Sequence, residues 1–143
     1  MKALMYRTFG PPESLVVEDV PPPQPAANEV QIRVRAAGIN FPDSLIIQNL
    51  YQIKPPLPFS PGGELAGEIT AVGVNVKSFA VGQSVIAFTG WGGFAEYAVV
   101  DSDRLIPYGQ KIRNTWRRSV RSMGLRVGRL GRVHFALQLT ALG

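Results

Sequence analysis

The clearest pattern in the chain is an alternation of apolar and polar residues from Glu29 to Ala37. In a strand, successive side chains point to opposite faces, so residues two apart share a face. Arg33 and Arg35 would then lie with Gln31 on a polar face. The opposite face is apolar and consists of Val30, Ile32, Val34 and Ala36. A second alternating segment runs from Glu64 to Val72, and we therefore predict two long strands that each turn one face toward a core.

Shorter β-rich segments and one short helix are expected around these two strands. The helix is predicted from Pro42 to Asn49 or Leu50, because its first turn holds a proline and the acidic Asp43, which both suit a helix N-terminus. The remaining strands are expected at residues 1–6, 14–20, 84–88, 94–100 and 104–107. The first two of them suit a hairpin with a longer loop. Many short strands with little helix predict a mainly β fold, either an all-β barrel or a sandwich.

Proline-rich segments separate several of the expected elements. Pro21 to Pro25 lie between two expected strands and favour an extended connector, although such a run can also be a partner-binding motif. Pro55 to Pro61 prevent regular structure ahead of Gly62 and Gly63, which precede the second long strand.

The composition excludes several kinds of site. With 143 residues, 45% of them hydrophobic, the chain is long enough for one domain with its own core. It has no cysteine and one histidine, His134, so neither disulfides nor cysteine or histidine metal sites are expected. The N-terminus lacks the apolar segment of a signal peptide, and no run of about 18 apolar residues could span a bilayer. We therefore expect a metal-free, soluble, cytoplasmic protein without a membrane span.

Charge is distributed very unevenly along the chain. Residues 1–109 hold seven Lys or Arg against ten Asp or Glu, a net charge of −3, whereas residues 110–143 hold eight basic residues and no acidic one, a net charge of +8. All twelve prolines also precede residue 110. We predict one domain over residues 1–109 and a separate arginine-rich tail over residues 110–143. The overall charge of +5 therefore describes the tail rather than the domain.

Four segments of the chain, taken in order, are similar to one known domain. They are MKALMYRTFGPPESLVVEDVPPPQPAANEVQIRVRAAGINFPD, PFSPGGELAGEITAVGVNV, FAVGQSVIAF and GGFAEYAVV. Together they resemble the N-terminal GroES-like catalytic domain of the medium-chain dehydrogenase/reductase superfamily, in its zinc-free quinone oxidoreductase (zeta-crystallin-like) branch. The resemblance covers residues 1–107 and implies a GroES-like, partly open β-barrel with one or two short helices.

The positions that bind zinc in the metal-dependent members of this superfamily carry other residues here. Where those members have a cysteine after Gly-Ile or Gly-Val, this chain has Asn40, and where they have the histidine of Gly-His-Glu it has Gly63. An amide and a hydrogen atom cannot replace a thiolate and an imidazole as zinc ligands, so a zinc alcohol dehydrogenase is rejected. Without a Lewis acid, hydride addition needs an acceptor that is already electron-poor, as quinones and α,β-unsaturated carbonyls are.

The resemblance implies NADPH-dependent reduction of such an acceptor. It places Asn40 near the nicotinamide and the substrate, Tyr51 along the substrate cleft, and Asp43 in support of the same loop. An asparagine amide and a tyrosine hydroxyl on a rigid ring both suit the orientation of a planar carbonyl. The family often has a second tyrosine six residues before Tyr51, and Leu45 stands there in this chain. That difference bears on the identity of the substrate more than on the type of reaction.

Each of these residues also has an ordinary structural interpretation. Asn40 suits a helix N-cap or an Asx turn, and Asp43 can offset the dipole of the helix. Tyr51 can simply pack over the mouth of the barrel. Trp91, in the glycine-rich loop at residues 89–93, is either an anchor for that loop or part of the cleft wall. Glu64 is either exposed at a strand start or an acid near the position that binds zinc in the metal-dependent members, and we assign it no catalytic role.

The tail from residue 110 lies outside the resemblance. In the family a Rossmann domain with a glycine-rich NADPH-binding turn follows the barrel, and the segment LRVGRLGRVHF lacks the strand, turn and helix that such a turn needs. Apolar residues recur at helical spacing from Ile112 to Leu137, so a basic amphipathic helix at a membrane surface or on nucleic acid is one interpretation. A surface helix packed on the open face of the barrel is another. We prefer a third, in which a frameshift replaced the Rossmann domain, and translation of the downstream DNA in its other two frames would test it.

Two functions of different class follow. The first is the N-terminal catalytic domain of an NADPH:quinone reductase-like oxidoreductase, from which we expect little activity and little NADPH binding alone, because a hydride donor needs a site to hold it. The second is a non-catalytic binding module whose barrel and basic tail contact a partner or an anionic surface. Nucleic acid is not the expected partner, and formation of a homo-oligomer is left open.

Overall fold

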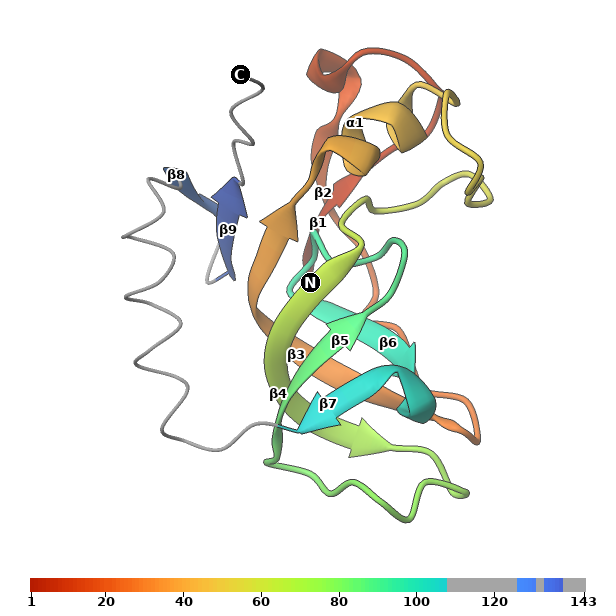
Figure 1. Ribbon diagram of the computed structural model, residues 1–143, viewed down its shortest axis with the longest axis vertical. Helices are drawn as coiled ribbons and strands as arrows, with labels where there is room; N and C mark the ends of the chain where they lie inside the picture. Colours follow the sequence, from red (N-terminus) through yellow and green to blue (C-terminus); the bar gives the residue numbers. More distant parts are fainter. Residues whose placement is uncertain (108–125, 131–132, 138–143) are drawn as a thin grey trace.

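The computed structural model describes residues 1–107, 126–130 and 133–137 and shows a mainly β chain (Figure 1). Its strands are β1 (Lys2–Met5), β2 (Val16–Asp19), β3 (Glu29–Ile39), β4 (Glu64–Val72), β5 (Ser84–Phe88), β6 (Tyr97–Asp101), β7 (Leu105–Pro107), β8 (Arg126–Leu130) and β9 (Val133–Leu137). They are accompanied by the helix α1 (Phe41–Ile47) and by two 3-10 helices, Pro12–Ser14 and Ser102–Arg104. The predicted fold class is confirmed, and the predicted bounds of β4 and β5 are those observed.

Strand β3 is the centre of the larger sheet. Within the described residues the strand order of this sheet is β7-β5-β4-β3-β9-β8, with β6 also paired to β3. All of these pairings are antiparallel except that of β3 with β9. The register of β3 against β4 shifts at two places, between Gln31 and Ile32 and between Val34 and Ala36, and such bulges bend a strand. Figure 1 shows β3 and β4 as long curved strands of a sheet that does not close, with α1 at the end of β3.

The apolar face predicted for β3 is confirmed, and the polar face is confirmed except at one residue. All four apolar side chains are buried: Val30, Ile32, Val34 and Ala36. On the other face Arg33 and Arg35 are exposed, but Gln31 is buried. Its Nε2 donates a hydrogen bond to the Pro23 carbonyl oxygen at 2.6 Å, and its Oε1 accepts one from the Thr70 hydroxyl at 2.7 Å. The proline-rich connector therefore lies against β3 and covers Gln31.

A second, smaller cluster of buried apolar residues holds α1 in place. It consists of Tyr6, Ile46, Ile47 and Phe59, with the partly buried Leu15 and Tyr51 packed against it. Tyr6 and Phe59 also exchange two backbone hydrogen bonds, of 2.8 and 3.1 Å, although their segments are far apart in the chain. Tyr6 directly follows β1. The sheet of β1 and β2, which is the predicted hairpin, is therefore joined through Tyr6 to α1 and to the proline-rich loop at residues 55–61.

Part of the tail forms a β-hairpin. β8 and β9 are antiparallel neighbours, and β9 pairs in parallel with residues 36–39 of β3. The helical interpretations of the tail are therefore wrong for residues 126–130 and 133–137. The other tail residues, 108–125, 131–132 and 138–143, lie outside the described residues. In the part of the chain that the structure describes, no helix combines the length and hydrophobicity needed to cross a membrane.

Candidate functional site

Asn40 lies between the end of β3 and the start of α1 and is the N-cap of the helix. Its backbone is extended, with φ −116° and ψ 158°, as is usual for a residue in that position. The Asp43 carboxylate accepts a hydrogen bond from the Asn40 backbone N–H at 2.8 Å, as in a capping box. The prediction of a helix N-cap at Asn40 is thus confirmed, and a hydrogen bond to Asp43 ties its backbone at the point where the strand becomes a helix.

Asp43 connects the helix to the proline-rich loop. Its side chain is buried, and its second carboxylate oxygen accepts a hydrogen bond from the Gly62 backbone N–H at 3.3 Å. Burial raises the pKa of the Asp43 carboxyl above its ordinary value, and the nearby Glu64 carboxylate also raises it. The hydrogen bonds from the Asn40 and Gly62 N–H groups oppose that rise, and so does the nearby backbone N–H of Gly63. Asp43 therefore acts as a buried link between two segments, beyond the dipole compensation that its place in the first turn predicts.

The raised pKa of Asp43 leads to a testable dependence of stability on pH. Because the folded chain binds this proton more tightly than the unfolded chain does, the free energy of unfolding is expected to fall as pH rises from the unfolded pKa through the folded one. Above that window the contribution of Asp43 is constant. Carbon-13 NMR of its side-chain carboxyl group measures the titration directly, and Asp43→Asn, which cannot titrate, should lack this part of the pH dependence. A midpoint at or below that of aspartate in an unstructured peptide would contradict the assignment.

Glu64 contacts the side chain of Asn40. It is the first residue of β4, and its Oε1 accepts a hydrogen bond from Asn40 Nδ2 at 2.9 Å. Glu64 pairs with Gly38 across the sheet, so its carboxylate lies over Gly38 and reaches the residue that follows β3. The site thus contains Asn40, Asp43 and Glu64 in one hydrogen-bonded group. Sequence reasoning noted Glu64 without giving it this contact, because the contact depends on the pairing of two strands.

The loop before β4 is fixed by the glycine-rich loop that follows β5. The Gly63 carbonyl oxygen accepts hydrogen bonds from the N–H groups of Thr89 and Gly90, at 2.8 and 3.2 Å. The N–H of Gly92 donates to the Ser60 carbonyl oxygen at 2.6 Å. Gly62 has a φ of +99°, where glycine is favoured. These contacts hold the backbone beside Asp43 in one conformation.

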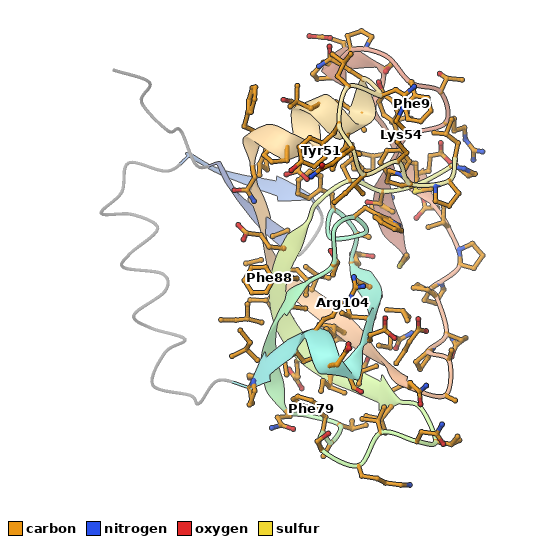
Figure 2. All side chains as sticks on the ribbon, turned by 45° about the vertical axis from the view of Figure 1, so that its right-hand side comes forward. Phe9, Tyr51, Lys54, Phe79, Phe88 and Arg104 are labelled. Carbon is orange, nitrogen blue, oxygen red and sulfur yellow. The ribbon has the colours of Figure 1, made fainter. Side chains whose placement is uncertain are left out.

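Tyr51 lies beside α1 (Figure 2) and forms no hydrogen bond with this group. Its ring is half-buried against the second apolar cluster, in agreement with the packing interpretation, and its hydroxyl has no hydrogen-bond partner among the described residues. Phe41, next to Asn40, is 71% exposed, and Trp91 is 41% exposed. The structure therefore brings Asn40 and Asp43 together, and it packs Tyr51, four residues after the end of α1, against the second apolar cluster.

The donor groups near Asn40 bear on the chemistry that the site can support. The asparagine amide has two N–H groups on Nδ2, and Glu64 accepts one of them. No described residue accepts a hydrogen bond from the second N–H group. The site therefore keeps one unused amide donor, and an amide does not ionise. The described segments contain no group of three or more His, Cys, Asp or Glu side chains that could hold a metal ion. Such a site can donate hydrogen bonds to the oxygen of a bound carbonyl compound.

The chain matches several known proteins. Residues 26–110 match the family model of the alcohol dehydrogenase GroES-like domain. A quinone oxidoreductase of Mus musculus is 38% identical over 109 residues, which are 75% of this chain and 33% of that protein. One of Pseudomonas aeruginosa is 39% identical over 106 residues, which are 73% of this chain and 32% of that protein.

Solved structures give the same comparison. Escherichia coli quinone oxidoreductase complexed with NADPH superposes with a TM-score of 0.72 and 31% identity, over 78% of this chain and 34% of that one. The chain thus spans about a third of the length of the curated relatives it matches.

Proposed function

The chain belongs to the alcohol dehydrogenase GroES-like domain family, and from that premise we propose that it supplies the acceptor side of an NADPH-dependent oxidoreductase. The proposed reaction is metal-free hydride transfer to a quinone or to an α,β-unsaturated carbonyl compound. The observation that carries this proposal is the position of Asn40, whose backbone is bonded to Asp43 and whose amide is bonded to Glu64. Relatives that bear the name quinone oxidoreductase support the choice of acceptor.

The residues of the site suit the charge changes of this reaction. When a hydride adds to a quinone or an enone, negative charge develops on the carbonyl oxygen, and a proton from the solvent completes the reduction. The second N–H of Asn40 is proposed to donate a hydrogen bond to that oxygen, and the Tyr51 hydroxyl is proposed as a further donor to it. Asp43 does not act on the substrate in this proposal but keeps Asn40 in place. The proposed catalytic residues are therefore Asn40 and Tyr51, with Asp43 as their support.

Neither zinc nor any other metal has a part in the proposed reaction. Two positions here correspond to zinc ligands in the metal-dependent members of the superfamily. One is Asn40, whose amide is hydrogen-bonded to Glu64, and the other is Gly63, which has no side chain. This donor set does not fit zinc. The acceptor must therefore be electron-poor before it binds, which is why quinones and enones are proposed and simple ketones are not.

NADPH, when bound, supplies the hydride. Asn40 is the residue proposed to face it, because its Oδ1 can accept a hydrogen bond from the carboxamide N–H of the nicotinamide while its two N–H groups contact Glu64 and the acceptor. We propose that the chain alone has low activity. Hydride transfer requires that NADPH be held in place, and Asn40 would supply only one contact to it.

Separate titrations of the dialysed chain with NADPH and with 1,4-naphthoquinone test the proposal. Because the chain has no cysteine, quinone addition to a thiol cannot imitate binding. Saturable binding of the quinone with weak or absent NADPH binding is the expected result. A micromolar dissociation constant for NADPH would show that the chain holds the cofactor as well. If the quinone fails to bind in the presence or absence of NADPH, the proposed function is wrong.

A further inference from the structure

We propose that Glu64 is a positioning residue that sets the direction of the Asn40 amide, and that Gly38 is needed to leave room for it. The proposal rests on the proposed function, because it concerns how Asn40 is presented to the electron-poor carbonyl acceptor. It assigns a role to a carboxylate that has no place in the hydride-transfer step itself.

The chemistry of the contact determines which way the amide points. An ionised carboxylate can only accept hydrogen bonds, so the Asn40 side chain must turn its Nδ2 rather than its Oδ1 toward Glu64, as the 2.9 Å contact shows. The amide group is planar, and its two N–H bonds have a fixed angle between them. Once Glu64 holds one N–H, the direction of the other is also fixed. That second N–H is the donor proposed to contact the acceptor oxygen.

The sheet register explains how Glu64 reaches Asn40. Glu64 lies opposite Gly38 in the β3–β4 pair, two residues before Asn40 in the chain. A Cβ atom at position 38 would lie only 3.0 Å from both Cγ and Cδ of Glu64, so a side chain there would displace the carboxylate. The backbone of Gly38 does not have a positive φ, and its need for glycine therefore comes from the space that Glu64 occupies.

Glu64 and Asp43 have separate tasks. Asp43 bonds to the backbone of Asn40 and of Gly62, so its loss affects the fold of the loop and the helix start. Glu64 is bonded to the side chain of Asn40, is only partly buried and lies at a strand end. Removing the Glu64 carboxylate should therefore leave the backbone in place and release the amide to rotate.

Four variants of the full chain separate this role from a general loss of structure. Glu64→Ala removes the acceptor, Glu64→Gln retains a carbonyl acceptor, and Gly38→Ala displaces the carboxylate without changing it. Glu68→Ala is the matched control, since Glu68 is on the same face of the same strand and forms its ion pair with the exposed Arg35 at 3.4 Å. The first readout is the pair of Asn40 Nδ2 proton resonances in the ligand-free chain, and the second is the dissociation constant for 1,4-naphthoquinone.

In the wild type and in Glu64→Gln and Glu68→Ala, the two Asn40 amide protons should stay far apart in chemical shift. In Glu64→Ala and Gly38→Ala they should move to the separation found in an unstructured peptide. Quinone binding should weaken about tenfold in Glu64→Ala and Gly38→Ala, as expected for loss of one oriented hydrogen bond. In Glu64→Gln it should weaken less than about threefold.

Two results would overturn the role of Glu64. One is an Asn40 amide signal in Glu64→Ala that matches the wild type, and the other is a changed signal with unchanged quinone affinity. If the wild type itself binds no quinone, the proposed function fails, and the amide resonances still decide whether Glu64 orients Asn40.

Discussion

Replacement of Asp43 by alanine is expected to lower the free energy of unfolding by about 2–4 kcal/mol, because two backbone N–H groups lose their acceptor and each buried unpaired group costs about 1–3 kcal/mol. These donors are the N–H groups of Asn40 and Gly62, in two segments that Asp43 connects. Removal of a buried carboxylate whose pKa is raised recovers part of this loss. Urea unfolding followed by circular dichroism measures the difference.

Two further variants serve as controls for this prediction. Asp43→Asn retains one carbonyl oxygen and can replace one of the two acceptors, so its loss of stability should be intermediate. Asp103→Ala removes an exposed carboxylate and should change stability by less than about 0.5 kcal/mol. Equal stabilities for Asp43→Ala and Asp103→Ala would show that Asp43 does not connect the two segments.

Replacement of Gly62 by alanine is expected to cost about 2–5 kcal/mol, the sum of about 1–2 kcal/mol for a side chain at positive φ and about 1–3 kcal/mol for steric overlap. Its φ is +99°, and a Cβ atom there would lie 2.8 Å from Phe94 Cε1 and 2.9 Å from the Phe94 backbone nitrogen. The Phe94 nitrogen cannot move away without disturbing its hydrogen bond to the Pro61 carbonyl oxygen, which joins the loop before β4 to the loop after β5. The same unfolding measurement applies.

Gly82→Ala is the matched control for this substitution. Gly82 also has a positive φ, +87°, but a Cβ atom there would meet nothing within 4 Å. Its replacement should cost only about 1–2 kcal/mol, the backbone contribution alone. If the two variants are equally stable, the overlap with Phe94 has no energetic weight and the loop before β4 is more adaptable than the structure implies.

Most of the sheet could be predicted because its signals are local. Period-2 alternation located β3 and β4, and a proline and an acid in one turn located α1. Gln31 was placed on a polar face and is buried, because the partners that satisfy it, Pro23 and Thr70, come from a connector and a neighbouring strand. Alternation describes only which face a side chain occupies, and not what covers that face.

The candidate site was predictable in part for the same reason. Asn40 and Asp43 are three residues apart, so helix-capping rules place them together. Glu64 is 24 residues from Asn40, and their contact follows from the pairing of Gly38 with Glu64 in the sheet. Tyr51 packs against the apolar cluster beside α1, and its place along the substrate cleft stays a prediction. The residue pattern does not specify which residues of strands far apart in the chain lie opposite each other.

The most direct test of the acceptor site is to map where the quinone binds on the nitrogen-15-labelled chain. We expect 1,4-naphthoquinone to shift the Asn40 side-chain amide, the backbone amides of Gly62 and Gly63 and the ring protons of Tyr51 along one saturation curve. In Asn40→Ala that curve should weaken at least about tenfold, corresponding to about 1.4 kcal/mol. Saturable shifts confined to other parts of the chain, or an affinity that Asn40→Ala leaves unchanged, would contradict the assignment of Asn40 to the acceptor site.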